Sequence, residues 1–233
     1  MKNKSTILLI VALVAIVIVS AIFGTKKEEE LNIEQTMHNI SYKVDGNEAK
    51  LNYDTENPVV AMYIEKYGSI VMELYPDKAP NTVNNFISLV KKGFYDDNTM
   101  HRFMKGFVLQ GGDPTGTGNG GPGYEIKGEF SGNGVDNDLK HLKGTVSMAR
   151  NSISMDSGGS QFFICLADET CSTLDGQYAA FGKILDGWDT INNIVDTVKV
   201  KSSQTGQLTK NLIIRKALVD TKGKTYEEPT HVK

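Results

Sequence analysis

An almost uninterrupted apolar run opens the chain and covers residues 6–23. In a helix, which rises about 1.5 Å per residue, this run would cross most of the hydrocarbon core of a bilayer. We therefore expect residues 1–24 to be a transmembrane anchor. A cleaved signal peptide is the alternative, because Val19-Ser20-Ala21 offers the small residues of a cleavage site. Both alternatives predict export, either as a single-pass cell-membrane protein with its domain on the extracytoplasmic side or as a secreted protein.

The pattern changes twice after this run. Residues 25–57 are polar, rich in Glu, Asn and Lys, and lack sustained periodicity, which is typical of a linker. Beyond them, two strand-like runs, 59–64 and 69–75, flank the pair Tyr67-Gly68. Runs of aliphatic and β-branched residues around such a pair predict a β-hairpin.

An amphipathic helix is predicted next, and further short strands follow it. Pro80 suits the first position of a helix, and Gly93 ends an apolar pattern of helical spacing, made of Val83, Phe86, Ile87 and Val90. The further strand candidates are residues 101–103, 107–110, 145–149, 161–166, 179–184 and 212–219, and a second helix candidate is 188–195. Many short strands with few helices predict an all-β fold, in which a closed or nearly closed antiparallel sheet is plugged by the two helices. Residues 221–233 are polar and are expected to form a loose C-terminal tail.

The charge balance excludes one class of partner. The 233 residues include 25 Lys and Arg against 28 Asp and Glu, which gives a formal charge of -3 and a pI near 5.8. Nucleic-acid binding requires clustered basic residues. We therefore expect no nucleic-acid partner.

Three patterns that could carry chemistry are weak. Residues 116–121 match the G-x-G-x-x-G pattern of dinucleotide sites, but Pro122 and Gly123 follow instead of a helix that opens on the glycines, so a tight loop is favoured. The four histidines lack metal-ligand spacing: His38, His101, His141 and His231. Cys165 and Cys171 could pair in an oxidising compartment, although Cys165 lies in an apolar run that favours a buried free thiol. We expect neither a metal nor a cofactor.

The segment 100–112 contains the main catalytic candidate, Arg102. On a strand, Arg102 would face one side of the sheet while His101 and Phe103 face the other. An arginine on a solvated strand face is the ordinary interpretation of such a pattern. Arg102 alone therefore does not define a site.

Several separate segments in a fixed order are more specific. Together they closely resemble the cyclophilin family of peptidyl-prolyl isomerases: MHRFMKGFVLQGGDPTGTGNGGPGYEIKGEF (100–130), GTVSMAR (144–150), GSQFFIC (159–165), LDGQYAAFGK (174–183) and the helix PNTVNNFISLVKKGFY (80–95). The resemblance covers residues 58–220 and implies a closed eight-stranded antiparallel barrel capped by two α-helices. It also implies an enzyme that accelerates rotation of X-Pro bonds in proline-containing polypeptides, here folding exported proteins.

The resemblance implies a site as well. Arg102 matches the catalytic arginine, and Gln110 is expected to orient its guanidinium. The other matched positions contact the substrate: Phe107, Val108, Gln110 and Phe163 in the proline pocket, Leu174 closing it, Gln161, Ala149 and Arg150 along the peptide backbone, and Gly118 in a flanking glycine loop.

Four positions depart from the commonest family pattern. Val108 replaces a frequent methionine, Tyr178, also counted among the substrate-binding positions, replaces a frequent histidine, and Arg150 in place of asparagine is similar to bacterial members. Thr173 stands where many eukaryotic members have a tryptophan that cyclosporin uses, so weak cyclosporin inhibition is expected.

Alternative functions remain open at this stage. The same barrel could be a binding module or holdase-type chaperone that grips proline-containing segments without turnover, or a structural domain of a surface assembly. The joint presence of Arg102, Gln110 and Phe163 favours the isomerase. We expect a monomer that is attached to the membrane through its N-terminal helix.

Overall fold

The computed structural model describes residues 40–42 and 47–232, and the predicted anchor or signal segment lies outside them. The chain divides into two units, residues 1–39 and 40–233, and only the second is described here. Within the described residues, no helix is both long enough and apolar enough to span a membrane.

Ten strands, three α-helices and two short 3₁₀ turns make up the described part of the chain. The strands are β1 (Ile40–Tyr42), β2 (Ala49–Leu51), β3 (Val59–Ile64), β4 (Gly68–Leu74), β5 (Asn98–Met104), β6 (Val108–Asp113), β7 (Thr145–Met148), β8 (Phe162–Cys165), β9 (Ala179–Asp186) and β10 (Gln207–Asp220). The helices are α2 (Pro80–Lys91), α3 (Asp168–Cys171) and α4 (Trp188–Thr197), and the 3₁₀ turns are η1 (Ser131–Asn133) and η2 (Ser172–Leu174).

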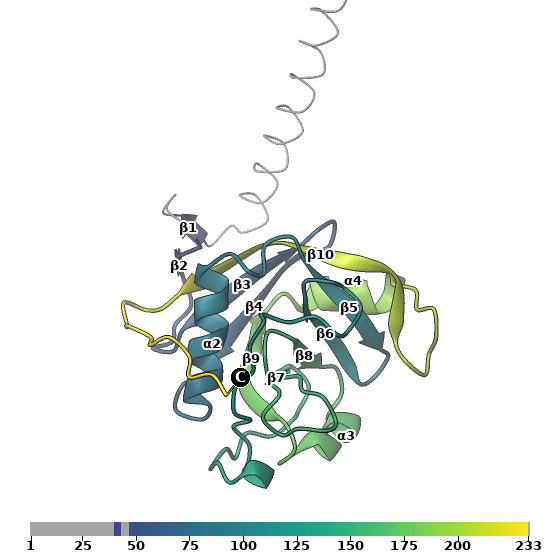
Figure 1. Ribbon diagram of the computed structural model, residues 1–233. Coiled ribbons are helices and arrows are strands. Elements are labelled where there is room, and N and C mark those ends of the chain that lie inside the picture. Colours follow the sequence, from purple (N-terminus) through teal and green to yellow (C-terminus); the bar gives the residue numbers. More distant parts are fainter. Residues whose placement is uncertain (1–39, 43–46, 233) are drawn as a thin grey trace, which may run out of the picture. The chain divides into compact units, whose positions relative to one another are not determined.

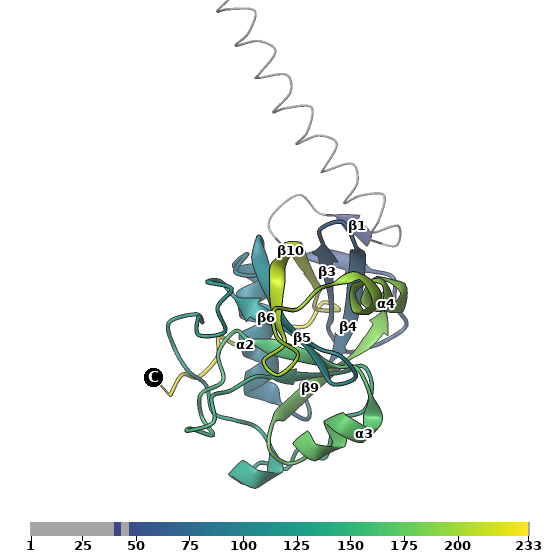
Figure 2. The ribbon, with the colours of Figure 1, turned by 90° about the vertical axis from the view of Figure 1, so that its right-hand side faces the viewer.

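Eight of the strands close into an antiparallel barrel in the order β10-β3-β4-β9-β7-β8-β6-β5 (Figures 1 and 2). Every predicted strand is present in this barrel, which confirms the closed all-β fold. β10 is longer than predicted because it closes the barrel, pairing with β3 along one edge and with β5 along the other. Its N-terminal extension brings Gln207 opposite Arg102.

Both predicted helices pack against the barrel, on opposite sides of it in the two views (Figures 1 and 2). The apolar face of α2 contributes Val83, Phe86 and Ile87 to the core, and α4 contributes Ile191 and Ile194. No side chain of its own caps α2; instead the Glu129 carboxylate accepts hydrogen bonds from the backbone N–H groups at the start of this helix. An acidic group there satisfies free donors and complements the helix dipole.

Residues 47–57 are more structured than the linker interpretation expected. β2 pairs with β1, and Leu51 is only 2% exposed. The Leu51 N–H donates to Asp220 Oδ2 at 2.8 Å, and the Lys222 ammonium donates back to the Leu51 carbonyl at 2.7 Å. The polar composition of this segment obscured a strand that is fixed by hydrogen bonds to residues 169 and 171 positions away.

The C-terminal residues also differ from the expected loose tail. They have no regular secondary structure, yet they cross α2, as the yellow trace in Figure 1 shows. Tyr226 packs against the core, and Pro229 is buried. Polar composition predicted solvation, whereas hydrogen bonds to α2 hold the segment in place.

A second apolar cluster lies apart from the main core. Phe162 and Ile164 belong to the core, so Phe163 and Cys165, which alternate with them on β8, face the other way. The same alternation on β6 sends Leu109 into the core and Val108 into the second cluster. Side chains from β6 and β8 therefore meet those of α3 and η2 on the outer surface of the barrel.

Candidate active site

A relay of hydrogen bonds joins Arg102 to two glutamines. Arg102 on β5 lies opposite Gln110 on β6, and its Nη1 donates to Gln110 Oε1 at 2.9 Å. Gln110 Nε2 in turn donates to Gln161 Oε1 at 2.9 Å. Side chains directly opposite one another on antiparallel strands share a face. Gln110 lies opposite Phe163 on β8, so Gln161, two residues before Phe163, is its diagonal neighbour in this polar row.

The guanidinium is anchored from its other side too. Arg102 Nε donates to the Thr205 carbonyl at 3.0 Å, and Nη2 contacts Met104 Sδ. Burial lowers the pKa of Arg102, while Tyr178 partly offsets that effect. An arginine nevertheless keeps its charge at physiological pH, so the relay presents a fixed, half-buried cation.

The second apolar cluster lies beside this cation. Its buried members are Val108, Phe163, Cys165 and Cys171, and its partly buried members are Met104, Phe107, Ala149, Leu174 and Tyr178. All of the predicted apolar pocket residues are in this one cluster. Phe163 is 5% exposed and meets Tyr178 edge to face, with ring centroids 5.6 Å apart.

Three polar residues that the sequence did not single out support Phe163. His141 stacks against its ring at 6.0 Å, and His141 itself is held between Asp175 Oδ1, 3.1 Å from Nδ1, and Ser147 Oγ, 3.0 Å from Nε2. Burial lowers the pKa of His141, and the bond to Asp175 opposes this shift. Ser147 is fully buried, so this Ser-His-Asp arrangement positions Phe163 and offers no accessible nucleophile.

The glycine-rich loop is organised by one carboxylate. Asp113 accepts hydrogen bonds from the hydroxyl and N–H of Thr115 and from the N–H groups of Thr117 and Gly118. Burial raises the pKa of Asp113, but these bonds outweigh burial and lower it to about 2. The loop turns its Gly118 and Gly120 carbonyls toward Gln161 Nε2, which donates to them at 3.0 and 2.9 Å. The expected tight loop is thus present, and Gln161 joins it to the relay.

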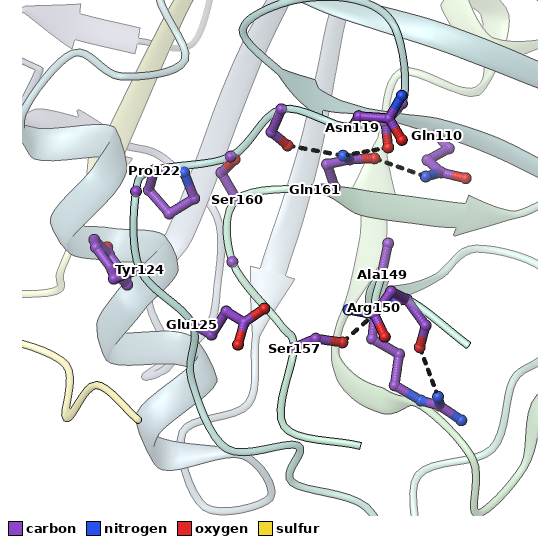
Figure 3. Close-up of a pocket in the computed structure, with 16 residues that line it drawn as sticks. Gln110, Asn119, Pro122, Tyr124, Glu125, Ala149, Arg150, Ser157, Ser160 and Gln161 are labelled. Carbon is purple, nitrogen blue, oxygen red and sulfur yellow. Dashed lines mark hydrogen bonds between the residues drawn. The ribbon is translucent and has the colours of Figure 1, made fainter. Parts of the chain in front are cut away.

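A hollow of 590 Å³ continues from this loop, which we call the flanking pocket. Its walls include Gln110, Gly118, Ala149, Arg150 and Gln161, all of them predicted site residues. Figure 3 shows the opposite wall, made of Tyr124 and Glu125 on the side of α2. The sequence did not identify that wall, because neither residue type signals a site by itself.

Arg150 of the flanking pocket contacts Tyr178 of the apolar cluster. The Arg150 guanidinium lies 4.8 Å from the Tyr178 ring centroid and donates to the Gln177 carbonyl at 3.0 Å. A cation over an aromatic face stabilises both groups. Thr173 is exposed in η2, next to Leu174.

Both cysteines are free, and both are buried members of the apolar cluster. The Cys171 thiol donates to the Phe107 carbonyl at 3.1 Å. A hydrogen bond with Cys171, together with burial, raises the pKa of Cys165. In residues 40–42 and 47–232, no three His, Cys, Asp or Glu side chains gather in a way that suits a metal ion.

The fold and this site combine a closed barrel with an apolar cluster, a fixed cation and the flanking pocket. The family model for "Cyclophilin type peptidyl-prolyl cis-trans isomerase/CLD" matches residues 59–219. The chain therefore belongs to the cyclophilin family and is a peptidyl-prolyl cis-trans isomerase that acts on proline-containing peptides.

Relatives and solved structures agree. The chain is 48% identical over 117 residues to a peptidyl-prolyl cis-trans isomerase of Helicobacter pylori, covering 50% of this chain and 67% of the relative. It is 47% identical over 131 residues to peptidyl-prolyl cis-trans isomerase B of Bacillus subtilis, covering 56% and 86%. The crystal structure of a Cryptosporidium parvum cyclophilin-type isomerase in the presence of the dipeptide Ala-Pro matches with a TM-score of 0.60 and 32% identity, over 70% of this chain and 98% of that one.

Proposed function

We propose that Arg102 catalyses the rotation and that the second apolar cluster binds the proline ring. The observation that carries this proposal is the fixed guanidinium at the edge of an apolar cluster that is separate from the core. Gln110 acts as a positioning residue, because it holds the guanidinium and in turn is held by Gln161.

The physical reason lies in the peptide bond. Rotation costs about 18–20 kcal/mol because the C–N bond must lose its partial double-bond character. In the twisted state the proline nitrogen regains a lone pair and becomes a hydrogen-bond acceptor. A fixed cationic donor therefore stabilises the twisted state more than either planar state, which is the condition for catalysis.

The rate acceleration that is needed exceeds what the arginine alone can supply. Bringing a step of tens of seconds into milliseconds takes about 10⁴-fold, or roughly 5 to 6 kcal/mol. One hydrogen bond to a charged group supplies about 1.5 to 3 kcal/mol. The rest is assigned to the pocket around Phe163, which would exclude water from the amide and fix the prolyl side while the acyl side turns.

The peptide backbone is proposed to lie along the polar row. Gln161, Ala149 and Arg150 line the flanking pocket beside Gln110. The related Cryptosporidium parvum structure was determined in the presence of Ala-Pro, which supports a proline-containing ligand for this site.

Replacing Arg102 tests the catalytic role. Arg102→Ala should lower kcat/KM for a proline peptide by about 10- to 100-fold, the value of one charge-assisted hydrogen bond. Lys105→Ala, a change at an exposed cation in the turn after β5, is the matched control and should leave the rate unchanged. An Arg102→Ala variant with full activity would refute this mechanism.

We further propose that the enzyme acts on exported proteins outside the membrane, as a monomer. The support is the apolar run at residues 6–23. Cell fractionation followed by intact-mass measurement checks this: the protein should appear in the membrane fraction with residues 1–24 retained, or outside the cell without them. Recovery only from the cytosol would contradict export, and a dimeric mass in solution would contradict the monomer.

A further inference from the structure

The C-terminal residues 226–232, which we call the C-terminal strap, are tied to α2 by side-chain hydrogen bonds. Glu228 Oε2 accepts from Ser88 Oγ at 2.9 Å and from Lys92 Nζ at 2.7 Å. Asn81 holds Thr230 in both directions, accepting from its N–H at 2.7 Å and donating to its carbonyl at 3.0 Å. A side-chain amide that pairs with both backbone groups of one residue fixes the path of the strap along the helix.

The tip of the strap contacts the far wall of the flanking pocket. The His231 ring stacks on the Tyr124 ring with centroids 3.7 Å apart and an interplanar angle of 12°. One residue later, the Val232 N–H donates to the Glu125 carbonyl at 2.8 Å. Tyr124 and Glu125 form the wall that Figure 3 shows on the side of α2. The strap thus meets this wall through both an aromatic ring and the backbone.

Helix α2 also holds the Tyr124 side of the flanking pocket, through Asn85. The Tyr124 hydroxyl donates to Asn85 Oδ1 at 2.7 Å, and Asn85 Nδ2 donates to the Gly159 carbonyl at 2.7 Å. Gly159 lines the flanking pocket as well. Asn85 therefore joins two walls of the flanking pocket. The strap contacts one of these walls, at Tyr124.

The strap has two parts with different roles. Tyr226 packs against the main core, so its contribution is to stability. The tip, residues 230–232, is exposed and meets Asn81, Tyr124 and Glu125. These residues lie beyond the 59–219 match, so they are a feature of this chain outside the part that the family model covers.

We infer that the C-terminal strap, through the stack of His231 on Tyr124, positions the wall of the flanking pocket and so sets which residue beside the proline the enzyme prefers. The inference rests on the proposed function, since it concerns the same peptide groove. His231 is a positioning residue that acts through Tyr124, and the substrate class is a proline peptide with a sizeable side chain at a position flanking the proline.

Peptide series measure the preference directly. A common Ala-Pro core is extended on either side, with one position at a time occupied by glycine or tyrosine, and kcat/KM is measured for the full chain. At one of these positions the wild type should show different kcat/KM values for the tyrosine and the glycine peptide. For that position, His231→Ala should change the ratio of the two kcat/KM values by about three- to tenfold, the size of one lost aromatic contact. The change should appear in KM, while the value for the glycine peptide stays within about twofold.

Two further variants separate positioning from folding. His231→Phe keeps a ring on Tyr124 and should restore the wild-type ratio. Lys224→Ala removes another C-terminal contact, the hydrogen bond to the Glu56 carbonyl, and should leave the ratio unchanged. An unchanged ratio in His231→Ala, or an equal loss for both peptides, would overturn the inference.

The test distinguishes this inference from the catalytic proposal. If Arg102→Ala keeps full activity, the mechanism fails, yet calorimetric binding of the same peptides to wild type and His231→Ala still measures the role of the strap. If Arg102→Ala is inactive and His231→Ala discriminates like the wild type, only the strap inference fails.

Discussion

At the scale of residues, the site depends on one chain of donors and acceptors. Each glutamine accepts with its amide oxygen on the side of Arg102 and donates with its amide nitrogen on the other side. The direction of every hydrogen bond in the relay is therefore fixed. A reversed amide at Gln110 would place two donors against each other. The Gly118 and Gly120 carbonyls therefore help to orient Arg102 through two intervening side chains, while the Thr205 carbonyl holds the other side of the guanidinium.

The relay predicts a non-additive loss of activity. Gln110→Leu leaves Arg102 Nη1 without its acceptor and should lower kcat/KM by about tenfold, with little change in KM. Gln161→Leu should have a smaller effect, because it acts through Gln110. A double-mutant cycle checks the coupling: the double variant should lose less than the sum of the two single losses. Purely additive losses would show that the two glutamines act independently.

At the scale of elements, the glycine-rich loop that follows β6 has no regular secondary structure, and hydrogen bonds to the Asp113 carboxylate hold it in place. Gly118 has a φ of 92°, a backbone conformation that residues other than glycine rarely adopt. A Cβ at Gly120 would lie 2.0 Å from Asp113 Oδ1. The glycines therefore allow the backbone to wrap around Asp113. The same pattern that imitates a dinucleotide motif in the sequence forms, in the structure, a tight loop around Asp113.

The loop predicts a defined acid response. The pKa of Asp113 is about 2, below its ordinary value of 3.8, so its stabilising contribution is complete above the ordinary value and is lost as the pH falls toward 2. Asp113→Asn should lower the free energy of unfolding by about 2 kcal/mol at pH 7. Urea unfolding at several pH values checks this: the difference between wild type and variant should shrink below pH 4. A constant difference from pH 7 to pH 2 would contradict it.

At the scale of the whole molecule, residues from both ends of the described part complete the barrel domain. The Asn47 side chain donates to the Val90 carbonyl at 2.8 Å, and the Asn47 backbone carbonyl accepts from the Val219 N–H at 2.8 Å. Together with Leu51, these contacts join the segment before β3 to α2 and β10. The stable domain is therefore expected to begin before residue 58.

Truncation tests this boundary. A chain that begins at residue 58 should unfold with a free energy about 3 to 5 kcal/mol lower than one that begins at residue 40, because it loses a buried leucine and several hydrogen bonds. Leu51→Ala in the longer chain should reproduce about 2 to 3 kcal/mol of this loss. Equal stabilities of the two truncated chains, measured by urea unfolding, would place the boundary at residue 58.

Sequence reasoning reached most of the site and part of its surroundings. Alternation on the strand separated Arg102 from Phe103, which belongs to the core. A register shift between Met100 and Arg102 interrupts the alternation at His101, which is buried beside Gly118 and is not part of the core cluster. The supports of Phe163 were not predictable in this way, since His141, Ser147 and Asp175 come from separate segments and meet only when β7, β8 and the η2 region pack together. Tyr124 and Glu125 were missed because neither residue type signals a site by itself.

The sequence by itself determined most of the local structure: the eight strands of the barrel, the helices α2 and α4, and the inward side of most of these strands. These properties depend on periodicity and on residues close in the chain. Only the tertiary structure decided the pairing of Arg102 with Gln110 and Gln161, the place of Leu51, and the contact of His231 with Tyr124. Such contacts join residues up to about 170 positions apart, and they form only when closure of the barrel has brought those residues together.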